Sequence, residues 1–125
     1  MEYKRKEMFR MVFSNPHKAT LRIVEIDGEP QVQLDETVIL VDISLRGAKI
    51  ECPHQYPADS QQVRLLLQLQ LNEKLISLLG EIVWEKSLGK MNQYGIHFDI
   101  DTPIEKDLLW ELKLFAKRNL QRKNS

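Results

Sequence analysis

The chain has 125 residues, of which 42% are hydrophobic, and this length and composition fit one compact domain with a single core. Its 18 basic and 18 acidic residues cancel, so no global field attracts nucleic acid or anionic lipid, and any anion site must be local. No apolar run approaches the roughly 20 residues that span a bilayer, no apolar stretch follows the basic N-terminus as in a signal peptide, and the single cysteine, Cys52, has no disulfide partner in the chain. We therefore expect a cytoplasmic protein without membrane insertion.

Residues 1–13 are the first element that we expect, a basic N-terminal arm. Lysines and arginines crowd residues 4–10, ahead of the first apolar run, and no packing requirement explains them there. Such a cluster is often a solvated, disordered tail, but it can also supply cations to an anionic ligand. The arm is therefore one half of a candidate anion site.

Six short strands are expected in residues 14–125. Residues 27–30 are a dense turn signal of the kind that joins hairpin strands. Residues 62–71 largely alternate between apolar and polar side chains, as in a strand with one buried face. The expected strands cover residues 20–26, 37–41, 48–50, 62–71, 75–84 and 94–100. Their hairpin-like links favour an antiparallel barrel or sandwich.

A helix is expected over residues 103–122, because the hydrophobic period changes there. Apolar side chains recur at helical spacing at Ile104, Leu108, Leu112 and Phe115. Thr102 is the expected N-cap, with Pro103 at the first helical position and Glu105 completing a capping box. The apolar face of this helix should close one mouth or side of the strand layer.

The hexapeptide at residues 42–47 joins the second expected strand to the third. An aspartate or serine at such a junction can hydrogen-bond a flat polar ligand, and a glycine can take a backbone angle closed to residues with a Cβ. The alternative is turn chemistry, in which Asp42 and Ser44 bond nearby backbone amides. Arg46, inside the motif, is a candidate for a phosphate contact or an ordinary solvent-facing arginine.

The order of the motifs resembles that of a PilZ domain over nearly the whole chain. Asp42, Ser44 and Gly47 match a [D/N]xSxxG motif at every defined position, and the stretches at residues 80–84 and 94–98 follow it in the expected order. The preceding RxxxR motif matches imperfectly, because Lys6 stands four residues before Arg10. The resemblance implies a six-stranded antiparallel split barrel with a C-terminal helix that acts as a receptor for cyclic di-GMP.

The same resemblance implies the residues of the binding site. They are Arg5, Lys6, Arg10, Asp42, Ser44, Arg46 and Gly47. A guanidinium can fork onto phosphate oxygens or onto guanine O6 and N7, and it can also stack on a base, which suits Arg5 and Arg10. Asp42 and Ser44 would read the guanine edge, and Gly47 would shape the backbone. Lys6 can supply only a point charge, and one lost charge-assisted hydrogen bond costs roughly 1.5–3 kcal/mol unless Arg5 replaces it.

The aromatic side chains favour a structural reading. Trp84, Tyr94 and Phe98 lie in expected strands among apolar neighbours, which is typical of core residues rather than of base-stacking platforms. Trp110, on the helix, can either pack on the barrel or meet another chain. The basic residues at the helix end are those that the helix dipole favours, so they are weak grounds for a nucleic-acid patch.

No reaction is indicated. The histidines are scattered, none has metal-ligand spacing with Cys52, and no serine lies in a nucleophile-elbow sequence. We expect a non-enzymatic cyclic di-GMP sensor without other cofactors, a monomer or homodimer that signals to an unidentified partner protein by ordering its N-terminal arm. The alternative is a PilZ-like adaptor that has lost the nucleotide and acts through protein contacts.

Overall fold

The computed structural model describes residues 10–124, which form seven strands and one long helix. The strands are β1 (Arg10–Ile26), β2 (Glu29–Pro30), β3 (Glu36–Ser44), β4 (Gly47–Cys52), β5 (Val63–Gln70), β6 (Leu75–Ser87) and β7 (Asn92–Phe98), and the helix is α2 (Thr102–Asn124).

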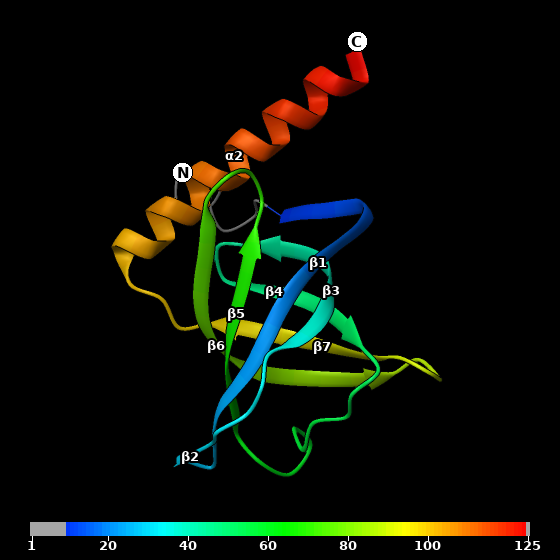
Figure 1. The fold of residues 1–125 in the computed structure, drawn as a ribbon, viewed down its shortest axis with the longest axis vertical. Helices are drawn as coiled ribbons and strands as arrows, with labels where there is room; N and C mark the ends of the chain where they lie inside the picture. The colour runs from blue at the N-terminus through cyan, green and yellow to red at the C-terminus, as the bar shows by residue number, and fades with distance from the viewer. Residues whose placement is uncertain (1–9, 125) are drawn as a thin grey trace.

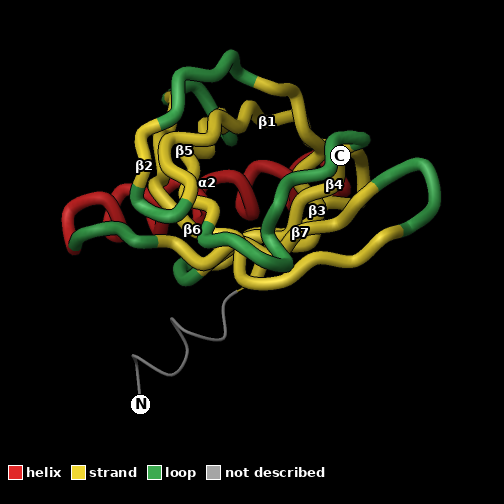
Figure 2. Tube along the Cα trace, turned by 90° about the horizontal axis from the view of Figure 1, so that it is seen from below, coloured by secondary structure: helices red, strands yellow, loops and turns green. Residues whose placement is uncertain are grey.

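Six of these strands close into a barrel. They are hydrogen-bonded in the order β1-β3-β4-β7-β6-β5, and β5 pairs again with β1 to complete the ring. All these pairings are antiparallel, and the short β2 only extends β1. Figure 1 shows α2 crossing the end of the barrel at which the β5–β6 turn lies, and Figure 2 shows the ring of strands with α2 behind it. The predicted six-stranded antiparallel barrel with a C-terminal helix is confirmed.

β1 begins at Arg10, ten residues before the strand start that the apolar pattern predicts. The early part of β1 pairs with the end of β3, with Arg10 opposite Ser44, before the register shifts between Val12 and His17. A bulge of this kind breaks the alternation of side chains, so the sequence gives no period-two signal there. Residues 1–9, which include most of the predicted arm, lie outside the described residues.

Other strands also differ from the prediction at their ends: β3 continues to Ser44 beyond the expected end at residue 41, and β4 covers Gly47–Cys52 rather than residues 48–50. β6 continues to Ser87, beyond the expected end at residue 84, and β7 covers Asn92–Phe98 rather than residues 94–100. The β6–β7 ladder is extended by polar pairs such as Ser87 opposite Asn92. Backbone pairing maintains these strand ends without burying side chains, so hydrophobicity does not mark them.

α2 begins one residue before the predicted start, and a different residue caps it. Asp101 Oδ1 accepts the backbone N–H of Ile104 at 3.1 Å, and the Asp101 carbonyl accepts that of Glu105 at 2.9 Å. Asp101 is therefore the N-cap, and Thr102 is the first helical residue. The N-cap that the sequence pattern placed at Thr102 is wrong by one position.

A single hydrophobic core fills the barrel and continues beneath α2. Leu108 and Leu112 of the helix are fully buried, and Tyr94 and Phe98 are core residues as predicted. The buried Glu111 accepts a hydrogen bond from the side chain of Asn72 at 3.0 Å, which ties the helix to the β5–β6 turn. Among the described residues, no helix is long and apolar enough to cross a membrane.

A small polar cluster lies where β4 ends. The Tyr94 hydroxyl accepts the backbone N–H of Tyr56 at 2.9 Å and donates to the carbonyl of His54 at 3.1 Å. The Tyr56 hydroxyl is buried close to the Cys52 thiol, yet it makes no hydrogen bond of ordinary geometry with any described residue. Burial is the main reason why the pKa values of Cys52, Tyr56 and Tyr94 are raised.

Candidate functional site

The turn between β3 and β4 is held by the hydroxyl of Ser44. Ser44 Oγ accepts the backbone N–H groups of Arg46 and Gly47 and donates to the carbonyl of Gly47, each at 3.3 Å. The Arg46 carbonyl accepts the N–H of Phe98 at 2.8 Å, which attaches the turn to the end of β7. Ser44 thus performs the turn chemistry that the sequence offered as an alternative, and this chemistry fixes the position of the Arg46 backbone.

Gly47 is required by close packing rather than by its backbone angle. Its φ lies outside the left-handed region, in which only Gly28 and Gly89 are found among the described glycines. A Cβ built at Gly47 would overlap the backbone carbonyl oxygen of Ile96 in β7. The expected unusual backbone angle at Gly47 is therefore wrong, and the absence of a side chain is what allows β4 to pair with β7 at this point.

Asp42 is buried between two cations. Its Oδ1 accepts a hydrogen bond from Arg10 Nη1 at 3.1 Å, and its Oδ2 lies 3.7 Å from Lys49 Nζ. Only 6% of the Asp42 side chain is exposed, compared with 57% for Arg10. A register shift between Leu40 and Asp42 places Ile43 in the core and Asp42 on the outer side, opposite Lys49. Three neighbouring strands thus meet at one carboxylate.

A hollow of about 200 Å³ opens beside this ion pair. Arg10, Arg46 and Lys49 contribute to its wall from β1, the β3–β4 turn and β4. Trp84 forms another part of the wall, with 42% of the residue exposed. A Cβ at Gly95 would overlap the Trp84 indole, so this ring packs directly on the β7 backbone. The hollow therefore combines three cations with one accessible aromatic side chain.

The structure brings together most of the site residues named from the sequence. Arg10, Ser44, Arg46 and Gly47 line the hollow. Asp42 does not line it but holds the Arg10 guanidinium at its edge. The exposed side chain of Arg46 agrees with both readings of that residue. Arg5 and Lys6 lie outside the described residues.

Sequence reasoning missed Lys49 and His97 and assigned Trp84 to the core. Lys49 alternates with the buried Ala48 and Ile50, so an outward position was readable, but its pairing with Asp42 required the strand register. Trp84 shares parity with the inward side chains of β6, and only the register shift between Ile82 and Trp84 turns it outward. His97 is an exposed β7 residue at the hollow that no motif distinguished.

The chemistry of this hollow suits an anion with a flat aromatic part. Guanidinium and ammonium groups bind phosphate oxygens, and an exposed indole can stack on a base. No cluster of three or more histidine, cysteine or acidic side chains in the described part of the chain could hold a metal ion.

Comparison with solved structures shows the same fold in two proteins. The PilZ domain of CeSA from a cellulose-synthesizing bacterium is 17% identical, with a TM-score of 0.58 and coverage of 84% of this chain and 98% of that one. The Bacillus subtilis inhibitor of motility MotI/DgrA is 13% identical, with a TM-score of 0.54 and coverage of 90% of this chain. The match spans 50% of the length of MotI/DgrA.

Comparison with sequence families gives the family. No curated protein sequence matches the chain. The sequence model of the PilZ domain, however, matches residues 3–114, which include the hexapeptide, Trp84 and the first half of α2. The chain belongs to the PilZ domain family.

Proposed function

We propose that this protein is a cyclic di-GMP sensor that passes its occupancy to a partner protein. PilZ domains are generally receptors for this nucleotide, and the chain belongs to the PilZ domain family. The observation that carries the proposal is the convergence of Arg10, Arg46 and Lys49 on a hollow that also exposes Trp84. The two phosphates of cyclic di-GMP can accept hydrogen bonds from the three cations, and its two guanines can stack on the indole.

Ligand binding would rearrange the contacts of Asp42. An ionised aspartate accepts well from the N1–H and N2–H₂ groups of guanine, but in the described structure Arg10 covers its carboxylate. The guanidinium is itself more than half exposed, so its movement onto phosphate costs little desolvation. In the proposed mechanism, Arg10 moves from Asp42 to the ligand and residues 1–9 close over the nucleotide.

β1 connects this event to the rest of the molecule. Three residues after Arg10, the ring of Phe13 stacks on His17 with centroids 4.7 Å apart and meets the edge of Phe115 in α2 at 5.7 Å. His17 also contacts Phe115 at 5.8 Å, and its Nε2 is 3.0 Å from the carbonyl of Gln70. A shift in the first residues of β1 would therefore be felt by α2, which supports coupling between the nucleotide and a partner-binding surface.

Calorimetric titration with cyclic di-GMP, with GTP as the specificity control, tests the nucleotide proposal. We expect saturable binding that Arg10→Ala and Asp42→Ala each weaken by about 10-fold or more, the effect of losing a charge-assisted hydrogen bond. Lys113→Ala, which removes an exposed charge from α2, is the matched control and should bind normally. If the titration releases no heat and a high nucleotide concentration does not raise the melting temperature, the sensor function is excluded.

A second candidate function is an adaptor that works without nucleotide. Two observations favour it: Lys6 stands where an arginine is expected, and the hollow of about 200 Å³ is smaller than the roughly 300–1,000 Å³ of typical ligand pockets. Limited proteolysis separates the two candidates. The sensor requires that nucleotide protects residues 1–9 from cleavage, whereas an adaptor gives the same cleavage pattern with and without it.

A further inference from the structure

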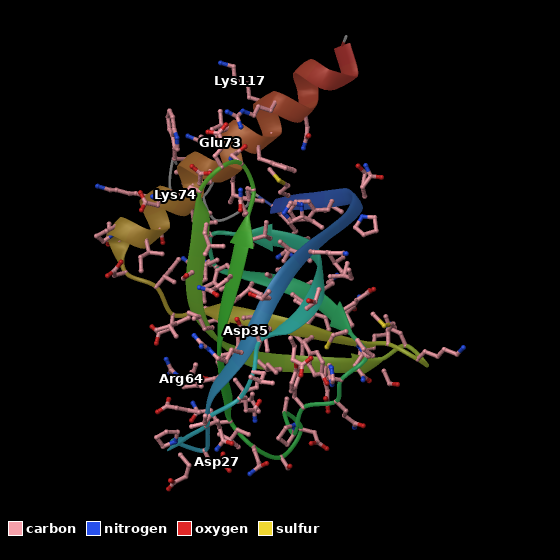
Figure 3. The ribbon with its side chains drawn as sticks, viewed as in Figure 1. Asp27, Asp35, Arg64, Glu73, Lys74 and Lys117 are labelled. Carbon is pink, nitrogen blue, oxygen red and sulfur yellow. The ribbon has the colours of Figure 1, made fainter. Side chains whose placement is uncertain are left out.

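α2 presents a second surface that the barrel does not use. Five side chains lie along one side of the helix at spacings of three and four residues, and we name them together the Trp110 face: Lys106, Trp110, Lys113, Leu114 and Lys117. Trp110 is 66% exposed, whereas Leu108 and Leu112, on the side of the helix that meets the barrel, are fully buried. In Figure 3 the side chain of Lys117 extends away from the barrel.

The charge of this face is uncompensated. In the part of the chain that the structure describes, no carboxylate forms an ion pair with Lys106, Lys113 or Lys117, although eight ion pairs of other residues are present, one of them with a histidine. Two of the three acidic residues of α2 make contacts away from this face. Asp107 is 3.2 Å from Lys74, and Glu111 is buried against Asn72. The molecule is neutral as a whole, so this positive face is a local feature.

A large exposed indole surrounded by lysines is unusual on a free surface. Tryptophan is rare at exposed positions and is among the residues most enriched at the energetic centres of protein interfaces. Within the described residues, Trp110 does not belong to the core, to which the helix contributes Leu108 and Leu112 instead. Lysines around such an anchor steer an oppositely charged partner and improve specificity more than affinity.

We infer that the Trp110 face docks a protein partner whose surface carries carboxylates around an apolar pocket that admits the indole. This inference rests on the partner-coupling half of the proposed function and names where that partner binds. Phe115 lies on the same helix and contacts Phe13, so the face is mechanically connected to the nucleotide site.

Two other occupants fit the observations less well. A membrane-binding helix inserts a broad apolar face, but α2 has already buried Leu108 and Leu112 in the barrel. Among the side chains that the structure describes, Trp110 is the large exposed apolar residue of α2, beside the half-buried Leu114. Nucleic acid is bound chiefly through a broad basic surface that contacts many phosphates, whereas this molecule is neutral overall and the face carries three lysines. A protein partner uses both the charge and the single aromatic anchor.

The test begins with photo-crosslinking in the native host. Benzoylphenylalanine replaces Trp110 in the full chain, and the same substitution at Leu34 is the control, because Leu34 is 86% exposed in the loop between β2 and β3, away from α2. We expect position 110, but not position 34, to crosslink one protein through a peptide rich in aspartate and glutamate. The crosslinked partner is then purified and its affinity measured.

Quantitative binding decides the proposal. Trp110→Ala should weaken the affinity for the purified partner about 10-fold or more, as expected for an interface anchor. Adding Lys113→Glu and Lys117→Glu should weaken the affinity further and reduce the salt dependence of binding. Leu34→Ala should bind like the unaltered protein. Unchanged affinity in Trp110→Ala overturns the inference. The inference is also overturned if position 110 forms no crosslink, or crosslinks to a second copy of this chain or to a partner without an acidic surface.

Defined probes complete the comparison. Vesicles of phosphatidylglycerol and phosphatidylcholine in equal parts and a single-stranded DNA oligomer should not bind the face, and binding of either that Trp110→Ala abolishes would replace the inference with a membrane or nucleic-acid surface. Calorimetry with cyclic di-GMP on the same samples separates the two proposals. If the protein binds nucleotide but no acidic partner is found, the nucleotide proposal stands and the docking inference fails. If an acidic partner binds the Trp110 face but nucleotide does not bind, only the docking inference stands.

Discussion

The two tryptophans of the chain illustrate how the position of a residue separates its roles. Trp84 lies in β6 against the backbone of Gly95 and forms part of the wall of the hollow, whereas Trp110 lies on the outer side of α2. Both are partly exposed, so replacing either leaves the buried core intact. They are a natural matched pair for testing which aromatic side chain meets the nucleotide.

Trp84→Ala should weaken cyclic di-GMP binding, while Trp110→Ala should not. Stacking of one base on an aromatic side chain is worth about 1–3 kcal/mol, so we expect a loss of roughly 5- to 150-fold. Titration calorimetry measures the loss, and nucleotide quenching of tryptophan fluorescence should persist in Trp110→Ala but vanish in Trp84→Ala. Equal affinity in the two variants would remove Trp84 from the site.

The buried phenol of Tyr56 predicts a pH effect on stability. Folding raises the pKa of Tyr56 chiefly by burial, and those of Tyr94 and Cys52 as well, above ordinary values of 10.0 for tyrosine and 9.0 for cysteine. The stability gained by keeping these groups neutral is complete below the ordinary values and decreases as the pH rises above them. The free energy of unfolding should therefore fall above about pH 9.

Tyr56→Phe isolates the contribution of that phenol. The substitution removes a hydroxyl without a regular hydrogen-bond partner, so the free energy of unfolding near neutral pH should be unchanged or slightly higher. Urea denaturation at about pH 7 and about pH 10.5 should show a smaller alkaline loss in the variant. An equally steep loss in both proteins would mean that other groups cause the alkaline effect.

At the scale of elements, the first turn of α2 depends on Asp101. Asp101→Ala removes the side-chain acceptor of the Ile104 N–H and should lower the free energy of unfolding by about 1 kcal/mol, within the 0.5–2 kcal/mol range of N-cap losses. Thr102→Ala, one residue later, should change it much less, because Thr102 is already helical. Chemical denaturation compares the variants, and a larger loss in Thr102→Ala would restore the cap that the sequence pattern predicted.

The six barrel strands and the helix were readable from hydrophobic period and turn residues, because β5 and α2 each bury one regular face, whereas the short β2 lies in a segment that was predicted as a turn. The positions of the site residues were less readable. Register shifts at Leu40/Asp42 and Ile82/Trp84 reverse the inward and outward sides of β3 and β6, and a shift depends on the partner strand rather than on the residues of the strand itself. The DxSxxG motif located the turn, but the burial of Asp42 and its ion pair with Arg10 could be seen only in the tertiary structure.

At the scale of the whole molecule, β1 is the element that links the hollow to α2. It pairs with β2, β3 and β5, it brings Arg10 to the hollow, and it brings Phe13 to Phe115 of α2. Phe13 lies inside the bulge between Val12 and His17, three residues after Arg10. Because the bulged stretch lacks a regular ladder, we expect that the first residues of β1 can shift without opening the barrel and that the aromatic contact passes this shift to the helix.

Phe13→Ala should therefore separate nucleotide binding from the response of α2. In the unaltered protein, saturating cyclic di-GMP should slow amide hydrogen exchange both in residues 10–13 and in the part of α2 around Phe115. The variant should still bind nucleotide and protect residues 10–13, but α2 should no longer respond, because the ring that contacts Phe115 is absent. Val12→Ala is the matched control, since the neighbouring Val12 side chain is 68% exposed. If α2 responds equally in Phe13→Ala, the signal does not travel through this aromatic contact.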